Sequence, residues 1–359
     1  MKIVASAPGK VVLLGEYAVL EGAPALSMAV DRRAVARITP RLGSRCEVQA
    51  PDILSAAAAL TFSADGAPQW SDGATAASLA LVDQVLRGLA HERALPTLGR
   101  GFALQLDTSA FFDQVGSERL KLGLGSSAAL TVALASALVA HFGRGAAAAD
   151  RRVWLERLLH IHREFQSGHG SGVDVATSLV GGLIEYRLSE GGTLPQARAA
   201  RWPQALHYCF VWSGRSASTP QLLATLQAWS KGHAADYAAR IAELSAIAEA
   251  GIAAVRSDNA AALLQTAAAY AAALRLLGAA SGVGIFSAEH LRLAELARLS
   301  GVVYKSCGAG GGDVGVAFAL DPQGLQHYAS ALAQEGFLRV PMAVDEGGLR
   351  LEFTEIDEV

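Results

Sequence analysis

The sequence predicts a protein of mixed α+β class that folds as two halves. Strand-like segments, such as residues 181–186, are interspersed with helix-like segments, such as residues 74–90. At 359 residues the chain is long enough for one large or two medium domains with substantial cores. A polar connection that contains proline, residues 191–203, is the best candidate boundary. We therefore predict domains at residues 1–190 and 191–359.

The composition excludes several classes of protein. Hydrophobic residues make up 52% of the chain and charged residues 18%, which is typical of a globular protein and not of a disordered one. The net charge is −3 without a lysine or arginine block, so no nucleic-acid partner is indicated. Cys46, Cys209 and Cys307 are far apart, which argues against a disulfide framework or a zinc site. No apolar leader or long uninterrupted apolar run occurs, so we expect a cytoplasmic protein with no membrane partner.

The first part of the chain is expected to form strands around two glycine turns. Residues 2–7 read as a strand that Ala7-Pro8-Gly9-Lys10 breaks with a turn, and residues 11–14 resume it as far as Gly15-Glu16-Tyr17. Because an apolar strand follows Lys10 at once, its ammonium group would be held in a fixed place. Residues 25–38 then read as one or two further strands.

The next segments lead to a glycine- and serine-rich stretch. Residues 74–90 carry apolar side chains at helical spacing, and residues 101–106 alternate as a strand. Residues 108–119 are expected to be a loop. The stretch that follows reads Lys121-Leu122-Gly123-Leu124-Gly125-Ser126-Ser127-Ala128-Ala129, and an apolar run typical of a helix comes after it.

This stretch suits a phosphate group, because a helix start offers free backbone N–H groups and the positive end of the helix dipole. A dinucleotide fingerprint would need a buried strand ahead of it, and residues 113–121 are too polar for one. A nucleophile elbow would need a closing glycine, and the Walker pattern is absent. A nucleotide-phosphate loop and a plain helix cap remain as alternatives.

A second helix is expected at residues 146–165, and a loop with three glycines leads from it to Asp174. Asp174 is either the N-cap of a short helix at residues 175–179 or a carboxylate at the mouth of a glycine-lined cleft. The spacing of His160, His162 and His169 matches no helical metal pair, so we interpret them as ordinary polar positions.

The second half begins with a strand at residues 207–212, which ends in a segment with one arginine among four hydroxyl side chains, residues 213–220. That segment is either an anion cradle or a helix start. The third glycine region, residues 308–313, lies between two strands and is too long for a two-residue turn, which favours a loop facing a ligand. The other expected elements are helices at 220–230, 235–254, 259–277, 287–300 and 322–335, and strands at 302–305, 314–320, 338–344 and 349–354.

Taken together, three glycine regions resemble the three ordered motifs of the GHMP small-molecule kinases. They are Pro8-Gly9-Lys10 with Gly15-Glu16-Tyr17, then Gly123 to Ala128, then Gly308-Ala309-Gly310-Gly311-Gly312-Asp313. The resemblance runs from position 5 to about position 320. It implies a two-lobed fold, with an N-terminal α/β sandwich lobe, a C-terminal ferredoxin-like α+β lobe and the active site in the cleft between them.

Further residues resemble the phosphomevalonate kinase branch of this superfamily. They are Tyr17 after Glu16, Lys121 two residues before Gly123, His162 and Gln166 ahead of residues 170–176, Trp212-Ser213-Gly214 ahead of residues 217–219, and Gly312-Asp313-x-Gly315. Two positions depart from that branch, because Gly168 stands where many members have lysine and Leu122 where they have threonine. The missing lysine bears on the identity of the acceptor more than on the chemistry.

The resemblance implies ATP- and Mg²⁺-dependent phosphorylation of 5-phosphomevalonate to 5-diphosphomevalonate, in the mevalonate pathway to isoprenoids. The loop Gly123–Ala128 (Gly123, Leu124, Gly125, Ser126, Ser127 and Ala128) would hold the ATP phosphates, and Ser127 would also hold Mg²⁺. The implied catalytic residues are Lys10, Asp174 and Ser127. The implied acceptor-binding residues are Glu16, Tyr17, Lys121, Ser171, Gly172, Arg215, Ser218, Thr219, Gly310, Gly311 and Asp313.

A phosphorylated acceptor would also need cations, because its phosphate is mostly ionised at neutral pH. Lys121, Arg215 and Lys305 are the candidates. Rival functions are a kinase of mevalonate, homoserine or a sugar, a related decarboxylase, a catalytically silent sensor of a nucleotide and a metabolite, and a nicotinamide dehydrogenase. The joint presence of Lys10, Ser127 and Asp174 favours an enzyme over a sensor, and a homodimer remains open.

Overall fold

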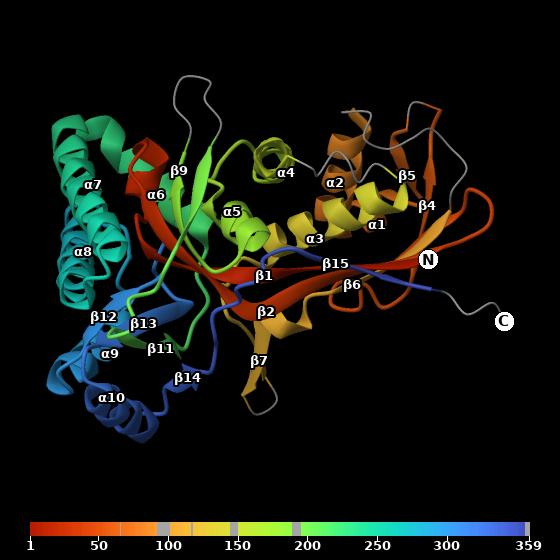
Figure 1. The fold of residues 1–359 in the computed structure, drawn as a ribbon. Coiled ribbons are helices and arrows are strands. Elements are labelled where there is room, and N and C mark those ends of the chain that lie inside the picture. The colour runs from red at the N-terminus through yellow and green to blue at the C-terminus, as the bar shows by residue number, and fades with distance from the viewer. Residues whose placement is uncertain (65, 92–100, 116–117, 144–149, 189–194, 356–359) are drawn as a thin grey trace.

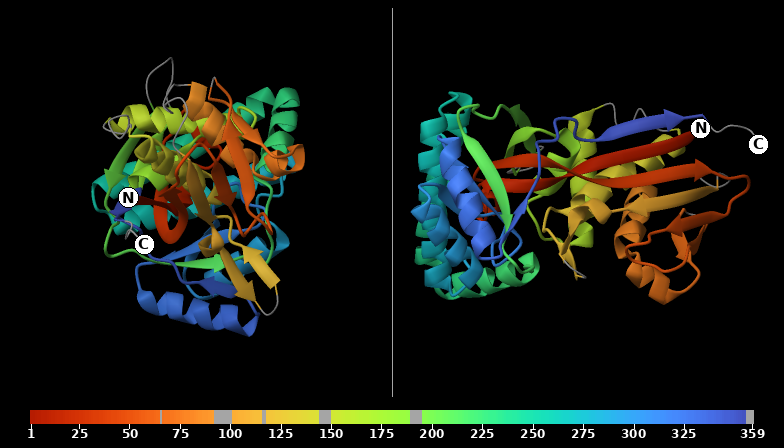
Figure 2. Two further views of the ribbon diagram at one scale, coloured as in Figure 1. Left: turned by 90° about the vertical axis from the view of Figure 1, so that its right-hand side faces the viewer. Right: turned by 90° about the horizontal axis from the view of Figure 1, so that it is seen from below.

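The computed structural model describes residues 1–64, 66–91, 101–115, 118–143, 150–188 and 195–355. In this part of the chain the strands form a nine-stranded sheet, a four-stranded sheet and a separate two-stranded hairpin. Figure 1 shows two long strands, β1 and β2, crossing the first lobe, with the second lobe and its helices at one end. Figure 2 shows an elongated molecule whose two termini lie at the end opposite to that second lobe.

The nine-stranded sheet is built on the central pair β1 and β2, which are antiparallel along most of their length. The strand order is β10-β9-β2-β6-β3-β4-β5, and β1 pairs with both β2 and β15. β3 and β6 are parallel, and the other pairs are antiparallel. The strands are β1 Lys2–Leu14, β2 Ala25–Pro40, β3 Cys46–Gln49, β4 Ala58–Phe62, β5 Pro68–Trp70, β6 Phe102–Asp107, β9 Leu183–Arg187, β10 Gln196–Ala200 and β15 Arg350–Thr354.

Helices cover one face of this sheet, and α3 lies innermost among them (Figure 1). Nearly every side chain of α3 is buried, and its many alanines let it pack closely on β1 and β2. A helix that is apolar on all sides is typical of a protein core, and α3 lies in the core of this lobe. The helices of this lobe are η1 Ala18–Glu21, α1 Gly73–Ser78, α2 Ala80–His91, η2 Ser109–Phe111, α3 Ser126–His141, α4 Arg151–Phe165 and α5 Val173–Val180.

Three local expectations are corrected in this lobe. Ala7 to Lys10 is not a turn, because β1 continues through it with a register shift between Pro8 and Gly9. The helix expected at residues 74–90 is divided into α1 and α2 at Leu79. Residues 108–119 are not a loop, because they contain η2 and most of a hairpin of β7 Phe112–Val115 and β8 Glu118–Lys121. Residues 146–149, at the start of the helix expected over residues 146–165, lie outside the described residues.

The second lobe has the ferredoxin-like arrangement. Its four antiparallel strands lie in the order β12-β13-β11-β14, which is the strand order of a split βαβ unit repeated once. Helices α9 and α10 pack on the sheet around the buried side chains of Val211, Leu293 and Tyr328. The elements are β11 His207–Trp212, α6 Thr219–Gly232, α7 Ala234–Arg256, α8 Ala260–Ser281, α9 Ala288–Leu299, β12 Val303–Ser306, β13 Val314–Ala319, α10 Pro322–Gln334 and β14 Leu338–Val340.

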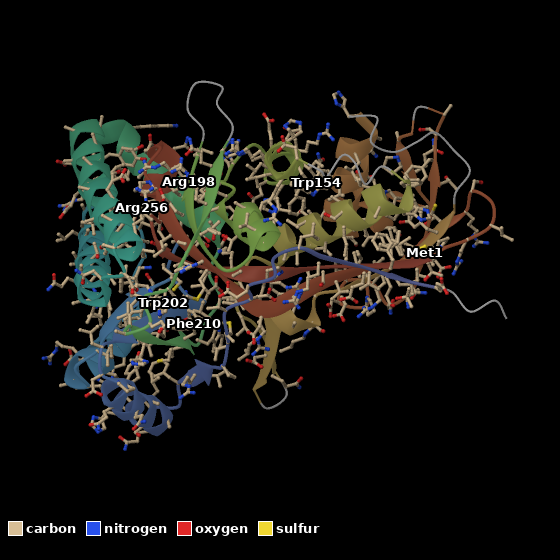
Figure 3. All side chains as sticks on the ribbon, in the orientation of Figure 1. Met1, Trp154, Arg198, Trp202, Phe210 and Arg256 are labelled. Atoms are coloured by element: carbon tan, nitrogen blue, oxygen red, sulfur yellow. The ribbon has the colours of Figure 1, made fainter. Side chains whose placement is uncertain are left out.

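The two lobes are tied together by the end of the chain and by ion pairs. β15 returns to β1, and β10 pairs with β9, so both strands belong to the first sheet. Arg33 in β2 donates to the buried carboxylate of Asp345 at 2.5 Å. Arg256, which Figure 3 labels beside α7, donates to both carboxylate oxygens of Glu185 in β9. The domain limits 1–190 and 191–359 stay a prediction. β10 and β15 come after residue 190 in the sequence, although both belong to the sheet of the first lobe.

Helix α8 is, among the described residues, the one helix long and apolar enough to cross a membrane by length and composition. In the fold it packs against α7 and β12, and Tyr270 and Leu274 on it are fully buried. A helix buried in a protein core can be as long and apolar as a membrane-spanning helix, so the length and composition of α8 are weak evidence for a membrane span.

Candidate active site

A cavity of about 450 Å³ lies between the two lobes, and both lobes contribute to its walls. Most of the predicted site residues line it. From the first lobe these are Lys10, Glu16, Tyr17, Lys121, Gly123, Gly125, Ser126, Ser127, Ser171 and Asp174, and from the second lobe Ser218, Thr219 and Asp313. Leu124, Ala128, Gly172, Arg215, Gly310 and Gly311 are not part of its wall.

The start of α3 opens into this cavity. Gly125 caps the helix in a left-handed conformation, φ 75° and ψ 41°, which a glycine adopts without strain. A Cβ atom at this position would lie only 3.1 Å from Cε of Lys10 and 3.6 Å from Cβ of Asp174. The glycine therefore lets both charged side chains approach the helix start, where the backbone N–H groups are free.

The loop ahead of α3 is fixed to β1 by backbone and core contacts. The Lys10 N–H donates to the Leu124 carbonyl at 2.9 Å, and the side chains of Leu124 and Ala128 are buried in the core. Leu124 and Ala128 therefore hold the loop in place, while Gly123, Gly125, Ser126 and Ser127 face the cavity.

Asp174 lies in the first turn of α5 and is not its cap. Gly172 is the N-cap residue, at φ 81°, and Leu159 leaves no room for a side chain there. The carboxylate of Asp174 accepts the neighbouring Val175 N–H at 3.0 Å and lines the cavity. The alternative that Asp174 caps this helix is wrong, and the carboxylate is instead placed beside Lys10 and the start of α3.

His162 is not the ordinary polar position that we expected from the spacing of the three histidines. It is buried on the inner face of α4, and its Nε2 lies 3.2 Å from Oγ of Ser127. Burial lowers the pKa of this imidazole, while the charge of Asp174 opposes the shift. The signal was its position four residues after Leu158 in the apolar stripe, which predicts a buried side chain. His160 and His169 are exposed, as expected of ordinary polar positions.

The Gly15-Glu16-Tyr17 turn is held by the second lobe. Glu16 forms an ion pair with Lys305, and both side chains are almost entirely buried. Tyr270 in α8 donates to the Glu16 carbonyl at 2.7 Å, and Tyr17, at φ 64°, donates to the Ala309 carbonyl at 2.5 Å. Burial raises the pKa of Glu16, and the charge of Lys305 opposes that shift without overcoming it.

This ion pair corrects the expectation for Lys305. Its ammonium group is fully buried, and besides Glu16 it donates to the Ser306 carbonyl at 2.7 Å. Because its charge is already compensated and the side chain does not line the cavity, Lys305 is not a free cation for an acceptor phosphate.

The third glycine loop contributes Gly308, Ala309 and Asp313 to the wall of the cavity. Gly310 and Gly311 instead pack against the chain before α9, where the Gly311 N–H donates to the Ile285 carbonyl at 2.8 Å. A Cβ atom on Gly310 would lie 2.3 Å from that same carbonyl oxygen, so glycine is required there for packing. Burial raises the pKa of the neighbouring Cys307 thiol to about 12, so the thiol stays protonated at neutral pH.

The segment before α6 supplies hydroxyl groups, but not its arginine, to the cavity. Ser216, Ser218 and Thr219 line the wall, whereas the Arg215 side chain is 56% exposed and lies 3.9 Å from Glu289. The segment is also a helix start, because Ser218 is the N-cap residue of α6. The helix-start interpretation is therefore confirmed, and the anion cradle stays a prediction that rests on the hydroxyl groups without the arginine.

The sequence analysis also missed the apolar part of the wall. Val12, Val19, Leu20, Pro220 and Leu223 line the cavity together with the polar groups. An apolar residue at the end of a strand or on a short helix cannot be distinguished by pattern from a core residue, because both lie on the same face of the element.

Ser127 and Asp174, which line the cavity at the start of α3, offer oxygen atoms of the kind that a magnesium ion prefers. Within the described ranges, no three His, Cys, Asp or Glu side chains are gathered as ligands for a metal. Mg²⁺ commonly takes only one or two protein oxygens and fills its other positions with phosphate oxygens and water. A hydroxyl and a carboxylate beside a phosphate-binding helix start are compatible with such a site.

Known proteins resemble this chain in both sequence and fold. The model of the GHMP kinases N-terminal domain matches residues 81–182. A phosphomevalonate kinase of Streptomyces sp. (strain CL190) is 29% identical, over 95% of this chain and 96% of its own. A mevalonate kinase of Thermococcus onnurineus is 27% identical, over 98% and 99%. The structure of Streptococcus pneumoniae phosphomevalonate kinase in complex with phosphomevalonate and AMPPNP has a TM-score of 0.75 at 17% identity, over 95% and 99%.

Proposed function

Since this chain belongs to the GHMP kinases and is a phosphotransferase, we propose that it transfers the γ-phosphate of ATP to 5-phosphomevalonate, giving 5-diphosphomevalonate and ADP. The observation that carries the proposal is a second lysine in the cavity, because Lys121 lines the wall next to the phosphate loop in addition to Lys10. An acceptor that already bears a phosphate needs such a further cation. The similar Streptomyces and Streptococcus phosphomevalonate kinases support the same acceptor.

The proposed roles follow from the placement of the residues. The start of α3 and the loop Gly123–Ala128 would bind the nucleotide phosphates through backbone N–H groups. Lys10 would neutralise charge on the transferring group, since it lies against Gly125 at that helix start. The phosphate of the acceptor is mostly ionised at neutral pH, so Asp174 would align Lys10 and the acceptor more than remove a proton.

Ser127 and Asp174 would hold Mg²⁺, which when bound neutralises charge on the nucleotide phosphates. Burial lowers the pKa of the His162 imidazole and so favours its neutral form, whose Nε2 can accept a hydrogen bond from the Ser127 hydroxyl. The lone pairs of the Ser127 oxygen then stay free to face a cation. We also propose a cytoplasmic location, which the free cysteines of the described chain support.

Mevalonate is the second candidate acceptor. Lys305 and Arg215 do not reach the cavity, so the wall has fewer cations than a phosphorylated acceptor was expected to require. The apolar side chains of Val12, Leu20 and Leu223 suit the carbon skeleton that the two acceptors share. The Thermococcus mevalonate kinase is also similar over nearly the whole chain.

The test is release of ADP by the purified protein with MgATP and one acceptor at a time. The acceptors are 5-phosphomevalonate, mevalonate, homoserine and galactose. We expect turnover with 5-phosphomevalonate and little with the other three. Turnover with mevalonate alone would show that the protein is a kinase of mevalonate and not of 5-phosphomevalonate. Binding of ATP without any turnover would favour a sensor.

The Lys121→Ala variant tests the acceptor phosphate. We expect its KM for 5-phosphomevalonate to rise by about tenfold to a hundredfold, because a charge-assisted hydrogen bond to the phosphate is lost. The Arg215→Ala variant should change this KM by less than about twofold, because the side chain lies outside the cavity. Lys231→Ala on α6, an exposed lysine away from the cavity, is the control. If Arg215→Ala raised this KM and Lys121→Ala did not, Arg215 and not Lys121 would bind the phosphate of the acceptor.

A further inference from the structure

A carboxylate of the second lobe lies directly against the phosphate loop of the first. Asp313 lines the cavity, and a Cβ atom placed on Gly123 would be 2.2 Å from its Cγ and 2.3 Å from its Oδ2. Its other oxygen, Oδ1, accepts the Ala217 N–H at 3.3 Å. The side chain of Asp313 therefore occupies the space beside the loop that a side chain at Gly123 would need.

This carboxylate has no ion-pair partner among the residues that the structure describes. Burial raises the pKa of Asp313, and the Ala217 N–H and the charges of Lys10 and Lys121, which line the same cavity, oppose that shift without overcoming it. A negative charge next to a loop that would bind phosphates disfavours every anion there, and the cost grows with the charge of the anion.

We propose that Asp313 determines nucleotide specificity by charge, so that the phosphate loop favours ATP carrying a divalent cation over metal-free ATP. The inference rests on the proposed function, because it takes the loop Gly123–Ala128 to bind nucleotide phosphates, and it goes beyond the acceptor-binding role first expected for Asp313. Bound Mg²⁺ cancels about half of the charge of ATP, so the repulsion from one carboxylate is roughly halved as well. The rejected ligand is the highly charged free nucleotide.

Two other roles of Asp313 predict different results. As a direct ligand of the metal ion it would strengthen binding of MgATP alone. As a purely structural link between the lobes, through Ala217 and Gly123, it would strengthen binding of both forms of ATP equally. The three roles can be separated because only the charge-based role makes removal of the carboxylate favourable to binding.

The Asp313→Asn variant isolates the charge. Asp313 has φ 59°, and asparagine tolerates this left-handed conformation as aspartate does. The amide oxygen can still accept the Ala217 N–H, so the local fold is retained while the negative charge is removed. Asp236→Asn, an exposed position in α7 outside the cavity, changes the net charge equally and is the matched control.

The experiment is isothermal titration calorimetry with ATP on the wild type and both variants, at constant ionic strength. Each protein is titrated once with EDTA and once with excess MgCl₂, without an acceptor. For Asp313→Asn we expect the Kd of metal-free ATP to fall about tenfold and that of MgATP about threefold, because the repulsion scales with the charge of the ligand. The control should match the wild type in both titrations.

Each other result would overturn the inference. Weaker MgATP binding with unchanged metal-free ATP would identify a metal ligand, and equal weakening of both would identify a structural link. Equal Kd values in the variant and the wild type would show that the charge has no effect. A wild type that binds neither form of ATP would overturn the proposed function together with the inference. That failure is recognisable before any variant is compared, and it does not depend on the identity of the acceptor.

Discussion

The Lys10→Met variant is expected to lose about a hundredfold to a thousandfold in kcat with MgATP and 5-phosphomevalonate, which is typical for removal of one preorganised group that stabilises developing charge. Lys10 lies on β1, its backbone N–H is bonded to the phosphate loop, and its side chain lies against Gly125 beside Asp174. Methionine has nearly the same shape without the charge, so the strand and its packing should be preserved.

The Asp174→Asn variant should lose a comparable factor, because the carboxylate orients Lys10 and the acceptor. If the two residues act as a unit, the double variant should be little worse than the more damaging single variant. Lys2→Met, at the other end of β1 and outside the cavity, is the matched control and should retain full activity. A Lys10→Met enzyme with unchanged kcat would remove this lysine from the mechanism.

The second large effect is expected on stability. The Lys305→Met variant should lose about 3–5 kcal/mol of the free energy of unfolding, because it leaves the buried carboxylate of Glu16 without its partner. The raised pKa of Glu16 shows that burial already disfavours its charge even with the lysine present. Urea unfolding followed by tryptophan fluorescence measures the loss.

A double variant gives the decisive comparison for this pair. Adding Glu16→Gln to Lys305→Met removes the remaining charge, so most of the lost stability should return. Lys231→Met, which replaces an exposed lysine of α6, should unfold at the wild-type urea concentration. A Lys305→Met protein as stable as the wild type would show that the pair does not hold the Gly15-Glu16-Tyr17 turn against the second lobe.

The three glycine motifs predicted the family and the mixed fold correctly. The matched GHMP kinase domain and the similar kinase sequences support the family, and the similar solved structure confirms the fold. The helix start after Gly125 was also predictable, because a glycine before a long apolar run is a local signal. Local signals were less reliable at Ala7 to Lys10, where proline and glycine indicate a turn but pairing with β2 keeps the strand extended through a bulge.

The assignment of single residues within the candidate site depended more on distant contacts. Lys305 and Glu16 are 289 positions apart, and no pattern in the sequence shows that they neutralise each other. His162 is one of three histidines close in sequence, and only the packing of α4 against α3 places it on Ser127. The roles of the individual site residues stay predictions until the variants are measured.

The sequence by itself determined most of the helices and the glycine loops, because these depend on backbone preferences and periodicity within a few residues of each position. The family was indicated by the resemblance of its three glycine motifs. The tertiary structure alone decided which charges face the cavity and which are compensated in the core. Lys305 and Asp313 are only eight positions apart, yet Asp313 lies against the phosphate loop and Lys305 is buried in an ion pair with Glu16 of the Gly15-Glu16-Tyr17 turn. The difference arises because burial and Coulomb interactions depend on distances in space, which the folded chain sets only when both lobes have packed together.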